Sequence, residues 1–154
     1  MQIIPLKNDF PLGFYEALAR VVVSFGRLEY LIKLCVKTLS AEAFTKGMAE
    51  AESKRQFADL CKTAKLRAQE KLNDSTKAER FSELIRQAED LAEFRHSAVH
   101  ALWTSHTNGL VMRISPKWDK SKRAVDWSRS HVVSVCELQQ TWENIEDLYL
   151  ALDA

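Results

Sequence analysis

The sequence is poor in the residues that break or cross-link regular structure: its 154 residues include only four glycines, three prolines and three cysteines. It shows no repeat, no low-complexity tract and no linker-like segment. These absences exclude a collagen-like or disordered chain. We therefore expect a single domain over residues 1–154, long enough to bury a substantial apolar core.

The three cysteines, Cys35, Cys61 and Cys136, are odd in number and lack paired spacing, which argues against a disulfide framework. Each lies among apolar positions of an expected helix, so we expect reduced core thiols, as in cytosolic proteins. The first ten residues lack the basic start and apolar region of a signal peptide, and no later apolar run could span a membrane. A cytoplasmic location is therefore expected.

Several catalytic signatures are also missing. The sequence has no glycine-rich phosphate loop, no nucleophile elbow and no Cys-x-x-Cys pair. Nucleotide hydrolases, esterases and zinc fingers are therefore unsupported. The formal net charge is only +1, but a balanced total can conceal a local basic patch.

Apolar residues at three-four spacing predict helices over about residues 11–39, 57–72 and 76–102, and a last helix after Ser130. Two segments have the form of capping boxes that would start the second and third helices: Ser53–Gln56 and Thr76–Glu79.

Between the third and last helices the pattern changes to short β-prone segments. Asn108-Gly109 predicts a two-residue hairpin turn, and "KRAVDWS", residues 122–128, offers a possible third strand. The expected fold is mainly α: a bundle of four to five helices with a β-hairpin or three-stranded insert before the last helix.

One charged residue, Arg95, occupies a core-facing position of the third helix. The apolar positions around it are Phe81, Leu84, Ala88, Leu91, Ala98 and Leu102. An unpaired buried guanidinium costs several kcal/mol, so Arg95 needs a partner, and Glu29 on the first helix is the candidate for an ion pair. A functional role is the alternative, because His96 and His100 lie one turn apart on one helical face.

The segment "RHSAVH", residues 95–100, matches the R-x4-H signature of HEPN domains, and "FRHSAVHALW" is similar to the usual context of that signature. HEPN domains are bundles of about four helices with this motif late in the third main helix. The resemblance therefore implies a fold of HEPN type.

The resemblance also implies an activity, since many HEPN proteins are metal-independent endoribonucleases in which the 2′-hydroxyl of RNA attacks the adjacent phosphate. An imidazole changes protonation near neutral pH, so His100 could move protons, while Arg95 could hydrogen-bond the phosphate. His96 occupies the polar position after the arginine and completes the expected catalytic set.

In a helix Arg95 and His100 diverge by roughly 140° at about 100° per residue. One chain then supplies an incomplete site, and the family resolves this by dimerisation. We expect a homodimer whose interface includes residues 95–103, with Trp103 as an interface aromatic.

The chain departs from the family's toxin subgroup that is silenced by nucleotidylation, because Leu102 replaces its tyrosine. A toxin or phage-defence nuclease with an antitoxin or partner protein is one expectation. The alternative is an inactive HEPN-like bundle that binds a protein or nucleic acid.

Two segments, residues 54–72 and 113–129, each have four more basic than acidic residues. If RNA is bound, its phosphates would be neutralised there; otherwise these are solvated surfaces. The expected RNA contacts are Lys62, Lys65, Arg113, Lys120, Lys122 and Arg123, with Trp118 and Trp127 as possible stacking partners.

Glu93, His96 and His100 could together bind a metal, but zinc would need a further ligand such as His106. A di-iron bundle would need a second Glu-x-x-His copy, which the sequence lacks. The expected nuclease needs neither a metal nor a cofactor.

Overall fold

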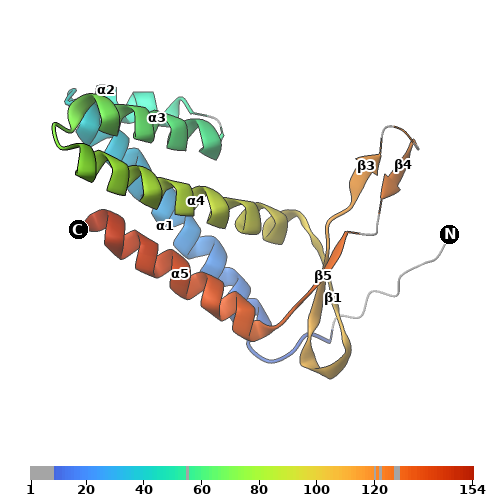
Figure 1. Ribbon diagram of the computed structural model, residues 1–154. Coiled ribbons are helices and arrows are strands. Elements are labelled where there is room, and N and C mark those ends of the chain that lie inside the picture. The colour runs from blue at the N-terminus through green and yellow to red at the C-terminus, as the bar shows by residue number, and fades with distance from the viewer. Residues whose placement is uncertain (1–8, 55, 120, 122, 127–128) are drawn as a thin grey trace. The chain divides into compact units, whose positions relative to one another are not determined.

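The computed structural model describes residues 9–54, 56–119, 121, 123–126 and 129–154. Within this part of the chain the structure is mainly helical, with a three-stranded antiparallel sheet before the last helix, as predicted (Figure 1). The helices are α1 (Phe14–Ser40), α2 (Phe44–Glu52), α3 (Phe57–Lys71), α4 (Ser75–His100) and α5 (Val135–Asp153). The strands are β1 (Leu102–Ser105), β2 (Val111–Ile114), β3 (Lys117–Asp119), β4 (Ala124–Asp126) and β5 (Ser130–Val133).

The contacts group the chain into two compact units. The first contains the residues up to Val22 and those from Phe94 to Trp142. The second contains Val23–Glu93 and Glu143–Ala154. The helices α1, α4 and α5 each contribute residues to both units, so both are built from separate pieces of sequence.

In the first unit, the sheet has the order β1-β2-β5, with neighbouring strands antiparallel. The predicted turn at Asn108-Gly109 lies between β1 and β2, but residues 106–110 separate the two strands, so the connection is longer than the two-residue loop that was expected. Asn108 and Gly109 adopt left-handed φ values of 59° and 71°, and the Leu110 N–H donates to the Thr107 carbonyl at 3.3 Å. Asparagine and glycine are favoured at such turns because both tolerate positive φ.

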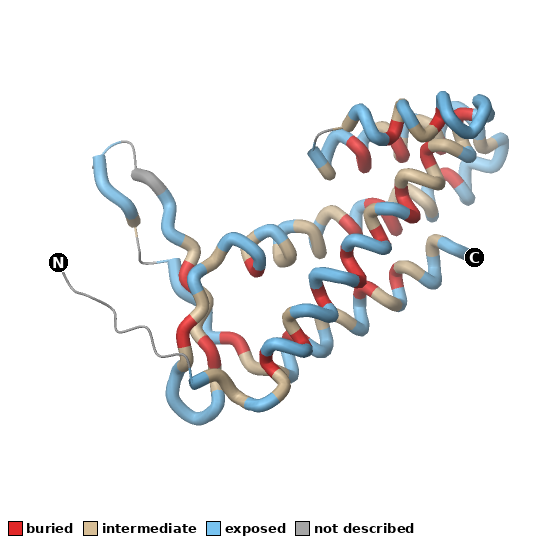
Figure 2. Tube along the Cα trace, turned by 180° about the vertical axis from the view of Figure 1, so that it is seen from behind, coloured by how far each residue is buried: buried red, intermediate tan, exposed pale blue. Residues whose placement is uncertain are grey.

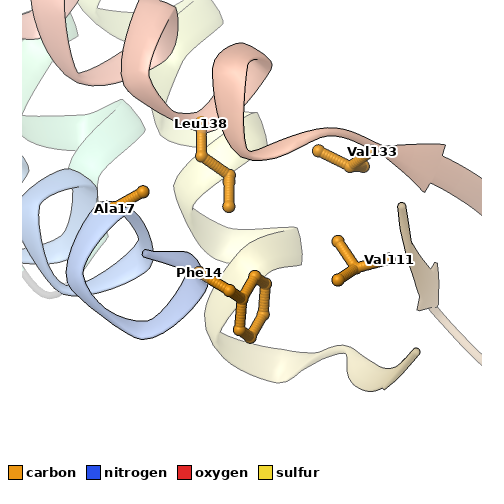
Figure 3. Close-up of a cluster of buried hydrophobic side chains, with 5 residues drawn as sticks. All are labelled: Phe14, Ala17, Val111, Val133 and Leu138. Carbon is orange, nitrogen blue, oxygen red and sulfur yellow. The ribbon is translucent and has the colours of Figure 1, made fainter. Parts of the chain in front are cut away.

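The core of this unit joins the sheet to the start of α1 and of α5. Figure 3 shows its side chains turned toward one another, and they are Phe14, Ala17, Val111, Val133 and Leu138. The Phe14 ring also meets the Trp103 ring edge to face, with 5.3 Å between centroids. Hydrophobic burial therefore holds the sheet against helical turns from distant parts of the sequence.

The prediction for residues 122–133 was wrong in two respects. The strand expected in "KRAVDWS" is β4, but it pairs with β3 in a separate two-stranded ribbon. The third strand of the main sheet is β5, where we expected the last helix to have begun. That helix begins only at Val135, because Ser134 and Glu137 form a capping box: the Glu137 N–H donates to Ser134 Oγ at 3.1 Å, and Ser134 N–H donates to Glu137 Oε2 at 2.6 Å.

The second unit is helical, and Figure 2 shows buried positions recurring along its helices between exposed ones. The largest fully buried side chains in this unit are Phe25, Leu28, Ile32, Val36, Leu60, Ile85 and Ile145. The predictions missed α2 altogether. A Cβ on its Gly47 would lie 3.0 Å from Lys37 Cγ and Ser40 Oγ, so α2 approaches α1 through a glycine rather than an apolar stripe.

Both predicted capping boxes were also wrong. The hydroxyl of Ser53 donates to the Glu50 carbonyl at the end of α2, and α3 follows Gln56 without a side-chain cap. Asp74, not Thr76, caps α4, because its Oδ1 accepts the Thr76 N–H at 2.9 Å.

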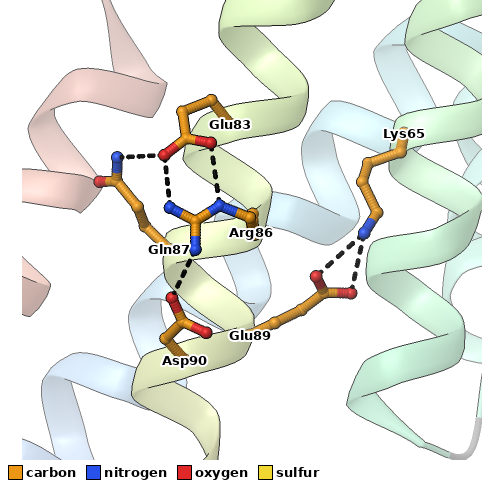
Figure 4. A network of polar contacts seen from close by, with 6 residues as sticks. All are labelled: Lys65, Glu83, Arg86, Gln87, Glu89 and Asp90. Atoms are coloured by element: carbon orange, nitrogen blue, oxygen red, sulfur yellow. Dashed lines mark hydrogen bonds and ion pairs between the residues drawn. The ribbon is translucent and has the colours of Figure 1, made fainter.

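Ion pairs support the surface of α4 in the second unit. Lys65 of α3 lies 2.9 Å from Glu89 of α4, and Arg86 bridges Glu83 and Asp90 along α4 itself (Figure 4). Hydrogen bonds from Arg86, and then from Gln87, lower the pKa of Glu83 to about 2.

All three cysteines are free, as expected. Burial raises the pKa of the Cys61 thiol to about 12. Cys136, however, is exposed on the first turn of α5, so the prediction of a core position was wrong for this residue.

Candidate functional site at the end of helix α4

The R-x4-H segment forms the last turns of α4, within the first unit. Arg95 is half-buried, whereas His96 and His100 are exposed. The apolar stripe explains the difference, because Ala98 is only 2% exposed and its side of the helix faces the core. Arg95 lies at the edge of that buried side, and the two histidines face solvent.

The two imidazoles lie next to each other. Their ring centroids are 4.6 Å apart, with 53° between the ring planes. The spacing follows from the helix, since residues i and i+4 lie one above the other on the same face. A small ligand at this surface could therefore contact both rings at once.

The end of the helix is held in place by its neighbours. Ser97 Oγ donates to the Phe94 carbonyl at 2.9 Å, and Trp103 Nε1 donates to the Ala98 carbonyl at 2.8 Å. The second bond satisfies a carbonyl that the final turn would otherwise leave without a partner. Trp103 is half-buried and its ring packs against Phe14 within its own chain, while the interface role expected for it stays a prediction.

Arg113 lies on the central strand β2 and packs on the same helix end. Its Cζ is 5.0 Å from the centroid of the Phe94 ring, a cation–π contact. Its Nε and Nη1 are buried and have no hydrogen-bond partner among the described residues. Desolvation by burial lowers the pKa of this guanidinium from its ordinary value.

Sequence reasoning missed His131, the residue opposite Arg113 on β5. Trp103 lies opposite Arg113 on the other side, so these three side chains form one cross-strand row. His131 is exposed. The adjacent β-branched residues Val132 and Val133 were the available signal for a strand, but the last helix is predicted to follow Ser130.

The other expected RNA contacts are more widely distributed in the chain. Lys62 is exposed on α3, and Lys65, on the same helix, is engaged with Glu89. Arg123 is exposed beside β4. Lys120, Lys122 and Trp127 lie outside the described residues, as does the side chain of Trp118.

The pairing expected between Arg95 and Glu29 stays a prediction. Glu29 lies 3.6 Å from Lys33, one turn further along α1. Glu29 therefore has a cationic neighbour on its own helix.

Within the described ranges, no three histidine, cysteine, aspartate or glutamate side chains gather in a group that could hold a metal ion. This includes Glu93, His96 and His100, the set considered from the sequence. None of the helices in the described part of the chain is long and apolar enough to cross a membrane.

Comparison with models of known protein families found no match, and comparisons with curated proteins and with solved structures found none either.

Proposed function

We propose that this chain is a HEPN-type endoribonuclease that cleaves RNA without a metal ion and belongs to a toxin or phage-defence system. The observation that supports the proposal most directly is the exposed His96–His100 pair beside the half-buried Arg95. Exposure leaves both imidazoles accessible to a nucleic-acid strand. Arg95 is half-buried, so part of this residue is accessible to a ligand.

The proposed reaction is a transesterification. The 2′-oxygen attacks phosphorus, the bond from phosphorus to the 5′-oxygen breaks, and the products are a 2′,3′-cyclic phosphate and a 5′-hydroxyl. One imidazole accepts the proton of the 2′-hydroxyl, and a second group protonates the departing 5′-oxygen. His100 performs one of these transfers, and Arg95 donates hydrogen bonds to the phosphate as negative charge develops.

The proposal includes a homodimer. Arg95 and His100 diverge around α4, so a complete site needs groups from a second copy. Val99 and Leu102, 47% and 37% exposed, lie within or just after the motif and provide apolar surface for this contact. Light scattering at micromolar concentration should give twice the mass of one chain.

The decisive experiment is an RNA cleavage assay with excess EDTA. RNA should be cut and DNA of the same sequence left intact, because DNA lacks the attacking 2′-hydroxyl. His100→Gln should lower the rate by about 10²–10⁴-fold, the usual contribution of general acid–base catalysis. His106→Gln, at an exposed histidine on the hairpin turn, is the matched control and should retain the rate.

Two results would contradict the nuclease. Cleavage that is abolished by EDTA would require a metal-dependent mechanism. Specific RNA binding by a protein that cuts no RNA would instead favour the inactive binding module.

A further inference from the structure

The exposed imidazole pair has a second chemical capacity that the cleavage reaction does not use. Two histidines at positions i and i+4 of a helix lie on one face, and this is the spacing at which helices present two nitrogen ligands to zinc. His96 and His100 have this spacing, and their ring centroids lie 4.6 Å apart. Rotation about the side-chain bonds suffices to direct one nitrogen of each ring at a shared ion.

The surroundings favour a cation at this position. The described residues give neither ring a hydrogen bond, so no protein partner has to be displaced. His100 is the last residue of α4, where the helix dipole places partial negative charge. The Trp103 hydrogen bond to Ala98 fixes the final turn, which limits the rearrangement needed for binding.

We propose that His96 and His100 form a two-ligand chelating site for Zn²⁺. Imidazole nitrogen suits zinc and other late first-row metals, whereas Mg²⁺ and Ca²⁺ select oxygen ligands. In the part of the chain that is described, no third protein ligand joins the pair, so water completes the coordination. The site is thus reversible, unlike a structural zinc site with four protein ligands.

The consequence for activity rests on the proposed function. A ring nitrogen that coordinates Zn²⁺ uses the lone pair that would accept a proton, so bound zinc and proton transfer by His100 exclude each other. Zinc would therefore inhibit the nuclease, and a chelator would activate enzyme that carries zinc.

The site is tested by calorimetric titration of metal-free protein with ZnCl₂. Wild-type protein should bind Zn²⁺, and MgCl₂ should give no binding heat. His96→Gln should weaken Zn²⁺ binding at least tenfold because it removes one of two ligands. His131→Gln, at an exposed histidine outside the pair, should leave affinity unchanged; equal loss in both variants, or no loss in His96→Gln, would overturn the proposal.

A cleavage assay with wild-type protein separates the two proposals. Inhibition by Zn²⁺ that EDTA reverses supports both. Zinc binding through the pair in a protein that cuts no RNA upholds the metal site and refutes the nuclease. Cleavage that is indifferent to zinc at concentrations that saturate the pair refutes the inhibitory role while the nuclease stands.

Discussion

Replacing Arg113 by methionine should make the protein more stable. Arg113 buries Nε and Nη1 without hydrogen-bond partners among the described residues, and its guanidinium rests on the Phe94 ring. Methionine keeps a long flexible side chain and can make a sulfur–aromatic contact with the same ring. The substitution therefore removes unsatisfied donors without opening a large cavity.

The expected gain follows from three terms. Each buried unsatisfied donor costs about 1–3 kcal/mol of stability. The substitution recovers only part of this free energy, because Arg113 is half-buried. Losing the cation–π contact costs about 0.5–1 kcal/mol, and the sulfur–aromatic contact returns about as much. The free energy of unfolding should thus rise by about 1–2 kcal/mol, or about 2–8 °C in Tm for a chain of this size.

Urea and thermal unfolding of wild type and Arg113→Met measure this change. The control is Arg129→Met, at an exposed arginine, whose free energy of unfolding should stay within about 0.5 kcal/mol of wild type. Because Arg113 is an expected phosphate contact, Arg113→Met should bind RNA more weakly than wild type. A loss of stability of 1 kcal/mol or more in Arg113→Met would refute the reasoning, because the guanidinium would then make stabilising contacts.

Three further outcomes are expected. In native protein at pH 8, a chromogenic disulfide reagent should modify the exposed Cys136 quickly and Cys61 only after denaturation, because burial raises the pKa of the Cys61 thiol. Fast modification of Cys61 in the native protein would contradict its burial. Ser134→Ala should lower the free energy of unfolding by about 0.5–2 kcal/mol through loss of the α5 cap, and an unchanged urea midpoint would count against that cap. Hydrogen bonds from Arg86 lower the pKa of Glu83 to about 2. The free energy of unfolding of wild type should therefore exceed that of Glu83→Gln by its full amount above about pH 4.5, and the difference should disappear as the pH falls toward 2. A difference that does not change with pH would refute this.

The helices were predictable where apolar spacing is regular and long. Helix α4 illustrates this, because Leu84, Ala88 and Ala98 are buried as the spacing required. The predicted helix ended at Leu102, two residues beyond the observed end of α4 at His100. Leu102 instead begins β1 and is 37% exposed. The sequence analysis missed β5 because this strand is short and lies next to the start of a helix. It has too few residues to show the alternating pattern of a strand.

The candidate site was predictable in its composition but only partly in its geometry. Helical periodicity placed His96 and His100 on one face, and the structure gives them adjacent rings. The same periodicity could not reveal that Arg113 packs on Phe94, since cross-strand register brings β2 to this helix. Lys65 shows the opposite limit, because a basic segment does not disclose which lysine is engaged by a carboxylate of another helix.

The core around Phe14 has a consequence for how the R-x4-H segment can be inherited. A block of sequence from residue 94 to 142 would contain this segment, the sheet and the start of α5, but not the Phe14 ring that contacts Trp103. Trp103 in turn holds the final turn of α4 through the Ala98 carbonyl. The segment is therefore not portable as a contiguous module, and recombination that separates it from the beginning of α1 would transfer the signature while losing the packing that supports it.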